Sequence, residues 1–337
     1  MTDLEPRPEP GGFTTAIVAS IAVGALAVGV ALYGADWSWS LPRATGTPGE
    51  GGRISARPVP GLATEEYGRR LVAHTAELLG QDHPDPDRRY INSRLNCGSC
   101  HLGAGTEPGT LTLLQTAEHY PRFSGRAGAQ TDIEDRINEC MTRSMNGRPL
   151  PMDSPEMMAM AAYLRSLGSQ YDAMGASLRK AVEPPPFRTP PRAADIAMGQ
   201  VVYSTRCTQC HGTDGQGLLA TADRARGYLF PPLWGPDSFN NGAGMHRVLT
   251  AARFIKARMP LGEPTLTDDE AFDVAAFINF KPRPEMANLE QDYPDRAAKP
   301  VDNPYGPFAD DFPLEQHRFG PFQPIEEHYK ALKKTAK

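Results

Sequence analysis

Two short stretches, Cys97-Gly-Ser-Cys-His101 and Cys207-Thr-Gln-Cys-His211, decide the fold of this chain. Each reads C-x-x-C-H, the signature of covalent haem c attachment, in which both thiols add to the porphyrin and the histidine becomes an iron ligand. Thioredoxin-like or zinc-binding pairs are the alternative, but they require a βαβ context or four ligands close together. The sequence therefore predicts two covalently bound haem c groups, held by Cys97, Cys100, His101, Cys207, Cys210 and His211.

Length and charge limit the class of protein. The chain has 337 residues, which allows two domains, and 40% of them are hydrophobic. Its formal net charge is −5. A general nucleic-acid binder carries a basic excess, so no nucleic-acid partner is expected. An anionic substrate would have to be attracted by local rather than overall charge.

The cysteine count adds a second clue. Four of the five cysteines belong to the two motifs, which leaves Cys140 without a disulfide partner in its own chain. Haem c attachment implies a compartment outside the cytoplasm, and an idle thiol is easily oxidised there. Cys140 is therefore a candidate functional residue.

An apolar segment lies near the N-terminus. From Phe13 to Tyr33 the chain is small and aliphatic, which is close to the ~20 residues that span a bilayer as a helix. A cleaved signal peptide has a shorter apolar core and a basic start. We expect residues 1–35 to anchor the protein in the inner membrane, with the haem domains in the periplasm. The alternative is cleavage near Ala35, which leaves a soluble periplasmic protein. Residues 36–62, rich in Gly, Pro and Ser, are expected to form a flexible tether.

The remaining chain repeats one plan: a helix, C-x-x-C-H, a loop with methionine, and a closing helix. The first copy begins its helices at Thr64, with capping-box spacing, and at Ser154. The second has a helix over 194–204 and a closing helix begun by Thr267, with Glu270 three residues later. This is the order of a class I cytochrome c. We predict an all-α protein with an N-terminal transmembrane helix and two class I cytochrome c-like domains, over 63–180 and 194–281. A Pro-rich linker over 181–193 joins the two domains. An extended, wrapping tail over 282–337 follows them, with a last helix near 325–334.

Each haem needs a sixth ligand. In the second domain Met259, followed by proline in the loop before the closing helix, is the expected ligand and gives a His/Met haem. Met245, an open site and the Lys256 amine are the alternatives. In the first domain Met152 is the ordinary expectation, and Cys140 competes with it.

Helical geometry supports Cys140. Residues 132–146 read as a helix that Gly147 ends, and on such a helix Arg136, Arg143 and Ser144 lie within about 60° of Cys140. Cations lower a thiol's pKa and favour the thiolate, and guanidinium groups suit anions with several oxygens. A buried idle thiol is the alternative. The unpaired thiol in an oxidising compartment favours ligation by Cys140.

At this segment the sequence resembles the dihaem cytochrome c thiosulfate dehydrogenases. The resemblance covers roughly residues 64–326 and rests on these strings: Ser124-Gly-Arg126, 135–151 (DRINECMTRSMNGRPLP), 230–245 (FPPLWGPDSFNNGAGM), 303–308 (NPYGPF) and 316–322 (QHRFGPF).

The resemblance implies a reaction and a set of roles. Two thiosulfate ions are joined to tetrathionate with release of two electrons, and some members also run in reverse. His101 and Cys140 are implied as axial ligands of the active-site haem, and Arg126, Arg136 and Ser144 as substrate-holding residues. The electron-exit haem, with His211 and Met259, passes electrons to a soluble cytochrome c or another periplasmic acceptor. The alternatives are a non-catalytic, membrane-tethered dihaem electron carrier of a respiratory or photosynthetic chain, and a dihaem peroxidase.

Overall fold

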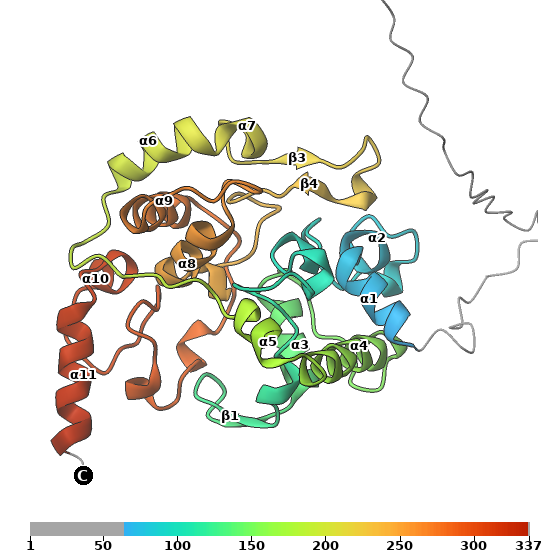
Figure 1. Ribbon diagram of the computed structural model, residues 1–337, viewed down its shortest axis with the longest axis horizontal. Helices are drawn as coiled ribbons and strands as arrows, with labels where there is room; N and C mark the ends of the chain where they lie inside the picture. The colour runs from blue at the N-terminus through green and yellow to red at the C-terminus, as the bar shows by residue number, and fades with distance from the viewer. Residues whose placement is uncertain (1–63, 336–337) are drawn as a thin grey trace, which may run out of the picture. The chain divides into compact units, whose positions relative to one another are not determined.

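The computed structural model describes residues 64–335, and its regular structure is mostly helical (Figure 1). The helices are α1 (Glu65–Ala73), α2 (Thr75–Leu79), α3 (Ile133–Thr142), α4 (Pro155–Asp172), α5 (Ala176–Val182), α6 (Ile196–Arg206), α7 (Thr208–His211), α8 (Val248–Arg258), α9 (Asp268–Phe280), α10 (Leu314–Phe319) and α11 (Gln323–Thr335). Two antiparallel hairpins pair β1 (Arg122–Ser124) with β2 (Ala129–Thr131) and β3 (Leu218–Leu219) with β4 (Tyr228–Phe230). The all-α prediction missed both hairpins.

The predicted anchor and tether, 1–35 and 36–62, lie outside the described residues. Over 64–335, no helix is both long enough and apolar enough to cross a membrane.

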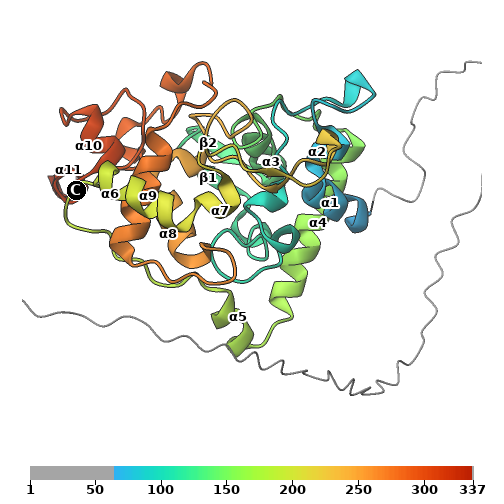
Figure 2. The ribbon, with the colours of Figure 1, turned by 90° about the horizontal axis from the view of Figure 1, so that it is seen from above.

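One helix crossing is built twice. In the first half α1 packs on α4, and in the second half α6 packs on α9 (Figure 2). Each crossing brings a glycine against a backbone carbonyl: a Cβ at Gly68 would lie 2.1 Å from the Ala159 oxygen, and one at Gly199 would lie 2.1 Å from the Asp273 oxygen. Only glycine permits backbones to approach this closely. The repeat read from the sequence is therefore also a repeat of packing.

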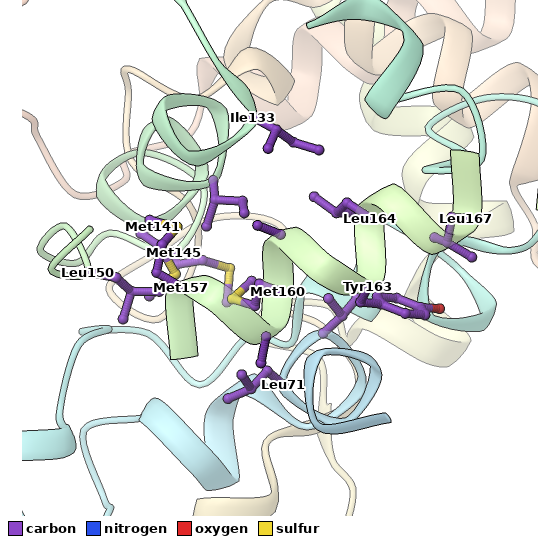
Figure 3. Close-up of a cluster of buried hydrophobic side chains, with 14 of the residues drawn as sticks. Leu71, Ile133, Met141, Met145, Leu150, Met157, Met160, Tyr163, Leu164 and Leu167 are labelled. Atoms are coloured by element: carbon purple, nitrogen blue, oxygen red, sulfur yellow. The ribbon is translucent and has the colours of Figure 1, made fainter. Parts of the chain in front are cut away.

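The first core is rich in methionine. Met141 and Met145, in and just after α3, and Met157 and Met160 of α4 are all buried, and Figure 3 shows their sulfur atoms near one another. Full burial of a side chain of this size contributes about 1.5–3 kcal/mol relative to exposure. These contacts hold α3, which carries Cys140, firmly against α4.

Two of the three predicted N-caps form. The Ser154 side chain accepts from Met157 N, and Thr267 and Glu270 form a full capping box. Thr64 makes no side-chain cap bond. A capping box needs Glu or Gln three residues after the cap, but that position is Tyr67, and Glu66 instead pairs with Arg69 at 2.7 Å. The predicted capping box at Thr64 was wrong.

The helix that carries Cys140 ends earlier than predicted. α3 stops at Thr142, and the next turn is closed by Met145 N donating to the Cys140 carbonyl and Gly147 N donating to the Met141 carbonyl. Asn146, with φ of 50°, takes the left-handed conformation there. Ser144 therefore lies outside α3, and the helical geometry used to place it beside Cys140 does not apply.

The tail contacts both halves. At its C-terminal end, Phe322 packs edge-on against Phe272 of α9, with 6.1 Å between ring centroids. Nearer its start, Tyr293 N donates to the Arg126 carbonyl of the β1–β2 hairpin at 2.8 Å. The predicted last helix is confirmed as α11.

Candidate haem and substrate sites

The two attachment motifs present their histidines in the same way. His101 Nδ1 donates to the Leu111 carbonyl at 2.7 Å, and His211 Nδ1 donates to the Pro231 carbonyl at 2.8 Å. A carbonyl can only accept, so the proton of each neutral ring is on Nδ1, and Nε2 keeps its lone pair. Histidines that bind metals are commonly fixed by this second hydrogen bond.

Burial shifts the pKa values of the histidines and cysteines of both motifs. It lowers the pKa of His101 and His211, which keeps the imidazoles neutral, as iron ligation requires. Burial also raises the pKa of Cys97 to about 12 and of Cys207 to about 11. Both thiols lie in surroundings that disfavour charge and fit uncharged thioether bonds to a porphyrin.

An apolar cavity of about 370 Å³ adjoins both motifs. Two potential iron ligands of the second domain, His211 and Met259, both line this cavity. Cys100 reaches it from the first motif, and Phe254 and Ile278 are among its apolar walls. An imidazole and a thioether facing one apolar space is the donor set of a His/Met haem. The residues present therefore fit a haem group here.

Met259 follows the last residue of α8, and its N–H donates to the Ile255 carbonyl at 2.8 Å. The alternatives differ in their availability. Lys256 Nζ donates to the Leu266 carbonyl at 2.5 Å and lies 3.9 Å from Asp268. Met245 also lines the cavity. Lys256 is thus held by partners of its own, whereas both methionines border the haem space.

The structure brings Cys140 close to the first motif. Burial, and after it the charge of Cys140, raises the pKa of Cys100 to about 11. The charge of Cys140 is also the main cause that raises the pKa of Arg136. Met152 lies elsewhere: it is 50% exposed, and its sulfur accepts from Asn138 Nδ2 at 3.6 Å. Of the two candidate ligands, Cys140 is the one near the attachment thiols.

The predicted substrate residues lie on two elements, the β1–β2 hairpin and α3 with the turn that follows it. Arg126 stands in the turn between β1 and β2, with its side chain 14% exposed. Arg136 is on α3, one turn before Cys140, and pairs with Glu139 at 2.9 Å. The charge of Glu139 also acts on Arg126. Ser144 follows the end of α3 and is partly buried.

The Arg143 side chain is engaged by partners other than Cys140. Its guanidinium donates to the Asp292 carboxylate at 2.7 Å and to the Gly242 carbonyl at 3.3 Å. The Arg143 guanidinium is thus bound by the tail and by Gly242 rather than left available to an anion.

Sequence reasoning missed Asp292 and Tyr305 of the tail. Tyr305 donates to Asp292 Oδ2 at 2.6 Å, and the same oxygen lies 3.9 Å from Arg126 Nε. Tyr305 belongs to the string 303–308, which carries part of the family resemblance, but the sequence assigned it no role. No local pattern could have pointed to Asp292.

Two family models match parts of the chain. A family described as SoxA/TsdA, cytochrome c domain, matches residues 90–171, and one described as cytochrome c oxidase, cbb3-type, subunit III, matches residues 194–278. These two matches contain the two C-x-x-C-H motifs, one in each. The chain thus has two cytochrome c domains.

Individual relatives are more specific. The chain is 42% identical to the thiosulfate dehydrogenase of Allochromatium vinosum over 222 residues, which is 64% of this chain and 77% of the relative. It is 39% identical to that of Stutzerimonas stutzeri, covering 66% of this chain and 69% of the relative. A solved thiosulfate dehydrogenase from Marichromatium purpuratum, in its as-isolated form, superposes with a TM-score of 0.57 at 31% identity, over 71% of this chain. The match spans half the length of that solved chain. The chain belongs to the thiosulfate dehydrogenase family of dihaem c-type cytochromes.

Proposed function

We propose that this protein oxidises two thiosulfate ions to one tetrathionate ion at the Cys140 side of the first haem, and passes the two electrons through the second haem to an external acceptor. The observation that supports the proposal is that Cys140 follows Arg136 by one turn of α3 and acts by its charge on Cys100, while Met152 is half exposed and contacts Asn138. A thiol next to a guanidinium in a haem domain has the parts for sulfur chemistry on an anion.

Charge is the first problem that the reaction poses. Two thiosulfate dianions repel each other, yet their terminal sulfur atoms must meet. Arg126 and Arg136 approach from different elements and offer two cationic forks for sulfonate oxygens. The Ser144 hydroxyl is proposed as a further hydrogen-bond donor to the substrate, as the family resemblance implies. The overall charge of the chain is negative, so this local pair is what attracts the substrate.

Cys140 provides the covalent step. Its thiolate and the terminal sulfur of one thiosulfate form an S–S bond as two electrons leave, which gives Cys–S–S–SO₃⁻. The second thiosulfate attacks the sulfur that bears the sulfonate, the bond to Cys140 breaks, and tetrathionate departs while the thiolate is restored. Charge balances in both steps. Arg136 stabilises the thiolate at the start and at the end of the cycle.

The residues that would hold the cofactors are His101 with Cys140 for the first haem and His211 with Met259 for the second. When bound, the two haems accept the two electrons that sulfur coupling releases. A thiolate ligand suits a low potential, and a methionine ligand raises it. Electrons would therefore move downhill from the substrate side to the second domain.

We further propose that the acceptor is a soluble cytochrome c or another periplasmic carrier and that residues 1–35 anchor the protein in the inner membrane. Haem c attachment and the apolar stretch from Phe13 to Tyr33 support this proposal. Mass spectrometry of the mature N-terminus, together with membrane fractionation, tests it. Recovery of a mature chain that begins near Ala35 in the soluble fraction would contradict the anchor.

The activity is tested with the full chain carrying both haems. Thiosulfate should reduce the protein and then an added acceptor, with two thiosulfate ions consumed and one tetrathionate formed for every two electrons. A simple electron carrier would instead accept electrons from a reduced cytochrome and form no tetrathionate from thiosulfate. Absence of tetrathionate during acceptor reduction would sink the proposal.

A further inference from the structure

One buried carboxylate lies between an arginine assigned to substrate and an arginine assigned to structure. Asp292 is 8% exposed. Its Oδ1 accepts from Arg143 at 2.7 Å, and its Oδ2 accepts from Tyr305 at 2.6 Å. Arg126 Nε lies 3.9 Å from the same Oδ2. The first two contacts are short charge-assisted hydrogen bonds, and the third is too long to be a hydrogen bond.

This geometry matters because the carboxylate competes with the substrate. An oxygen of Asp292 and a sulfonate oxygen of thiosulfate would use the same N–H groups of Arg126. A closed Arg126–Asp292 ion pair, with both side chains mostly buried, would have to be broken before an anion could bind. At 3.9 Å the two groups form an ion pair without a hydrogen bond, so the N–H groups of Arg126 are not used up by Asp292.

Tyr305 is well placed to hold Asp292 Oδ2 at its distance from Arg126 Nε. Burial and the bond to Asp292 raise the pKa of Tyr305 to about 12, so its hydroxyl remains a donor at ordinary pH. The Tyr305 N–H donates to Asn303 Oδ1 at 3.1 Å, and its carbonyl accepts from Lys299 Nζ at 3.1 Å. The tyrosine is therefore fixed by its own neighbours as it holds Oδ2.

Backbone contacts fix the other side. Tyr293 N donates to the Arg126 carbonyl at 2.8 Å, and the Tyr293 ring lies 5.8 Å from the Arg126 guanidinium carbon. Arg296 donates to the Asp292 carbonyl at 2.6 Å. Residues 292–305 of the tail thus hold both the hairpin that carries Arg126 and the carboxylate beside it.

We propose that Tyr305 is a positioning residue that restrains the Asp292 carboxylate away from Arg126, so that this guanidinium stays available to a dianionic substrate. The inference rests on the proposed function, because it assigns Arg126 to thiosulfate. Asp292 stabilises the fold through its ion pair with Arg143. Tyr305 prevents the same carboxylate from occupying the N–H groups of Arg126.

The test compares steady-state kinetics of holoenzyme variants. In Tyr305→Phe, Asp292 Oδ2 loses its donor, and the nearest replacement is Arg126 Nε, so the ion pair closes. The KM for thiosulfate should rise about tenfold with kcat nearly unchanged, since substrate at saturation still displaces the carboxylate. Tyr329→Phe is the matched control: it removes another tyrosine hydroxyl that donates to a tail carboxylate, that of Asp310, and should leave KM unchanged.

A second substitution separates restraint from general damage to the tail. Adding Asp292→Asn to Tyr305→Phe removes the competing charge and should return KM to near the wild-type value. An unchanged KM in Tyr305→Phe, or a double variant whose KM stays as high as that of the single variant, would overturn the inference. Both outcomes differ from failure of the proposed function, in which the wild-type protein itself forms no tetrathionate.

Discussion

Arg94, three residues before the first attachment cysteine, donates to the Asp237 carboxylate of the second domain at 2.8 Å. Tyr228 of β4 donates to the same oxygen at 2.8 Å, and Gln81 donates to the other oxygen at 3.0 Å. Arg94 also pairs with Asp82 at 2.5 Å. A partly buried, fully bonded network therefore joins the segment before the first haem motif to the loop after the second.

This network predicts a measurable loss on breaking it. Asp237→Asn leaves the partly buried Arg94 with Asp82 but without its second carboxylate, so the free energy of unfolding of the holoprotein should fall by about 1–2 kcal/mol. Denaturant unfolding followed by haem absorbance measures the change. Glu66→Gln removes an exposed partner of Arg69 and should have no measurable effect. Equal losses in the two variants would mean that the network contributes no more to stability than an exposed ion pair.

Cys140 should be replaceable without loss of haem but not without loss of catalysis. Cys140→Met offers a thioether to the first iron, so two haems should remain attached while thiosulfate turnover falls by about 10²-fold or more. Low-temperature EPR should lose the signature of a thiolate-ligated ferric haem.

The matched control for that variant is Met152→Leu. Met152 is half exposed and touches Asn138, so turnover and the EPR spectrum should both stay as in the wild type. If Met152→Leu, and not Cys140→Met, changed the first haem's spectrum, the assignment of ligands would be reversed.

Lys299 should make stability depend on pH. It is 4% exposed, and burial, followed by repulsion from Arg296, lowers its pKa to about 8 from an unfolded value near 10.5. Between these values the unfolded chain binds more protons at this site than the folded chain, so this group's contribution to stability rises with pH.

Lys299→Met should remove that contribution. The difference in unfolding free energy between wild type and variant should grow in favour of the wild type from pH 8 to pH 10, by no more than about 3 kcal/mol. Comparing the two proteins cancels the titration of tyrosines common to both. A difference that stays constant over this range would show that Lys299 titrates normally.

The helix crossing in the second domain should not tolerate a methyl group. In Gly199→Ala the new Cβ would meet the Asp273 carbonyl of α9, and neither backbone can move aside easily. Stability should fall by about 2 kcal/mol or more. Gly175→Ala is the control, because nothing lies within 4 Å of the position of its Cβ. Thermal unfolding of both variants, followed by circular dichroism, measures the difference, and equal midpoints would contradict the packing argument.

Local signals in the sequence were enough for the covalent chemistry and the helical plan. C-x-x-C-H is contiguous, so each histidine is placed by its own motif, and the caps at Ser154 and Thr267 lie within one turn of the helices that they begin. The count of five cysteines alone singled out Cys140. Helical periodicity correctly placed Arg136 one turn from it, because both lie inside α3.

Long-range packing decided the rest. Arg143 and Asp292 are 149 residues apart, and no periodic pattern links a helix end to an irregular tail. The same holds for Arg126, which lies in a three-residue-strand hairpin fixed by contacts with the tail rather than by strand propensity. The sequence by itself determined the two attachment motifs and singled out Cys140, because these signals are local. Only the tertiary structure decided which arginine remains open to an anion, because that depends on the partner each guanidinium finds after the chain has folded.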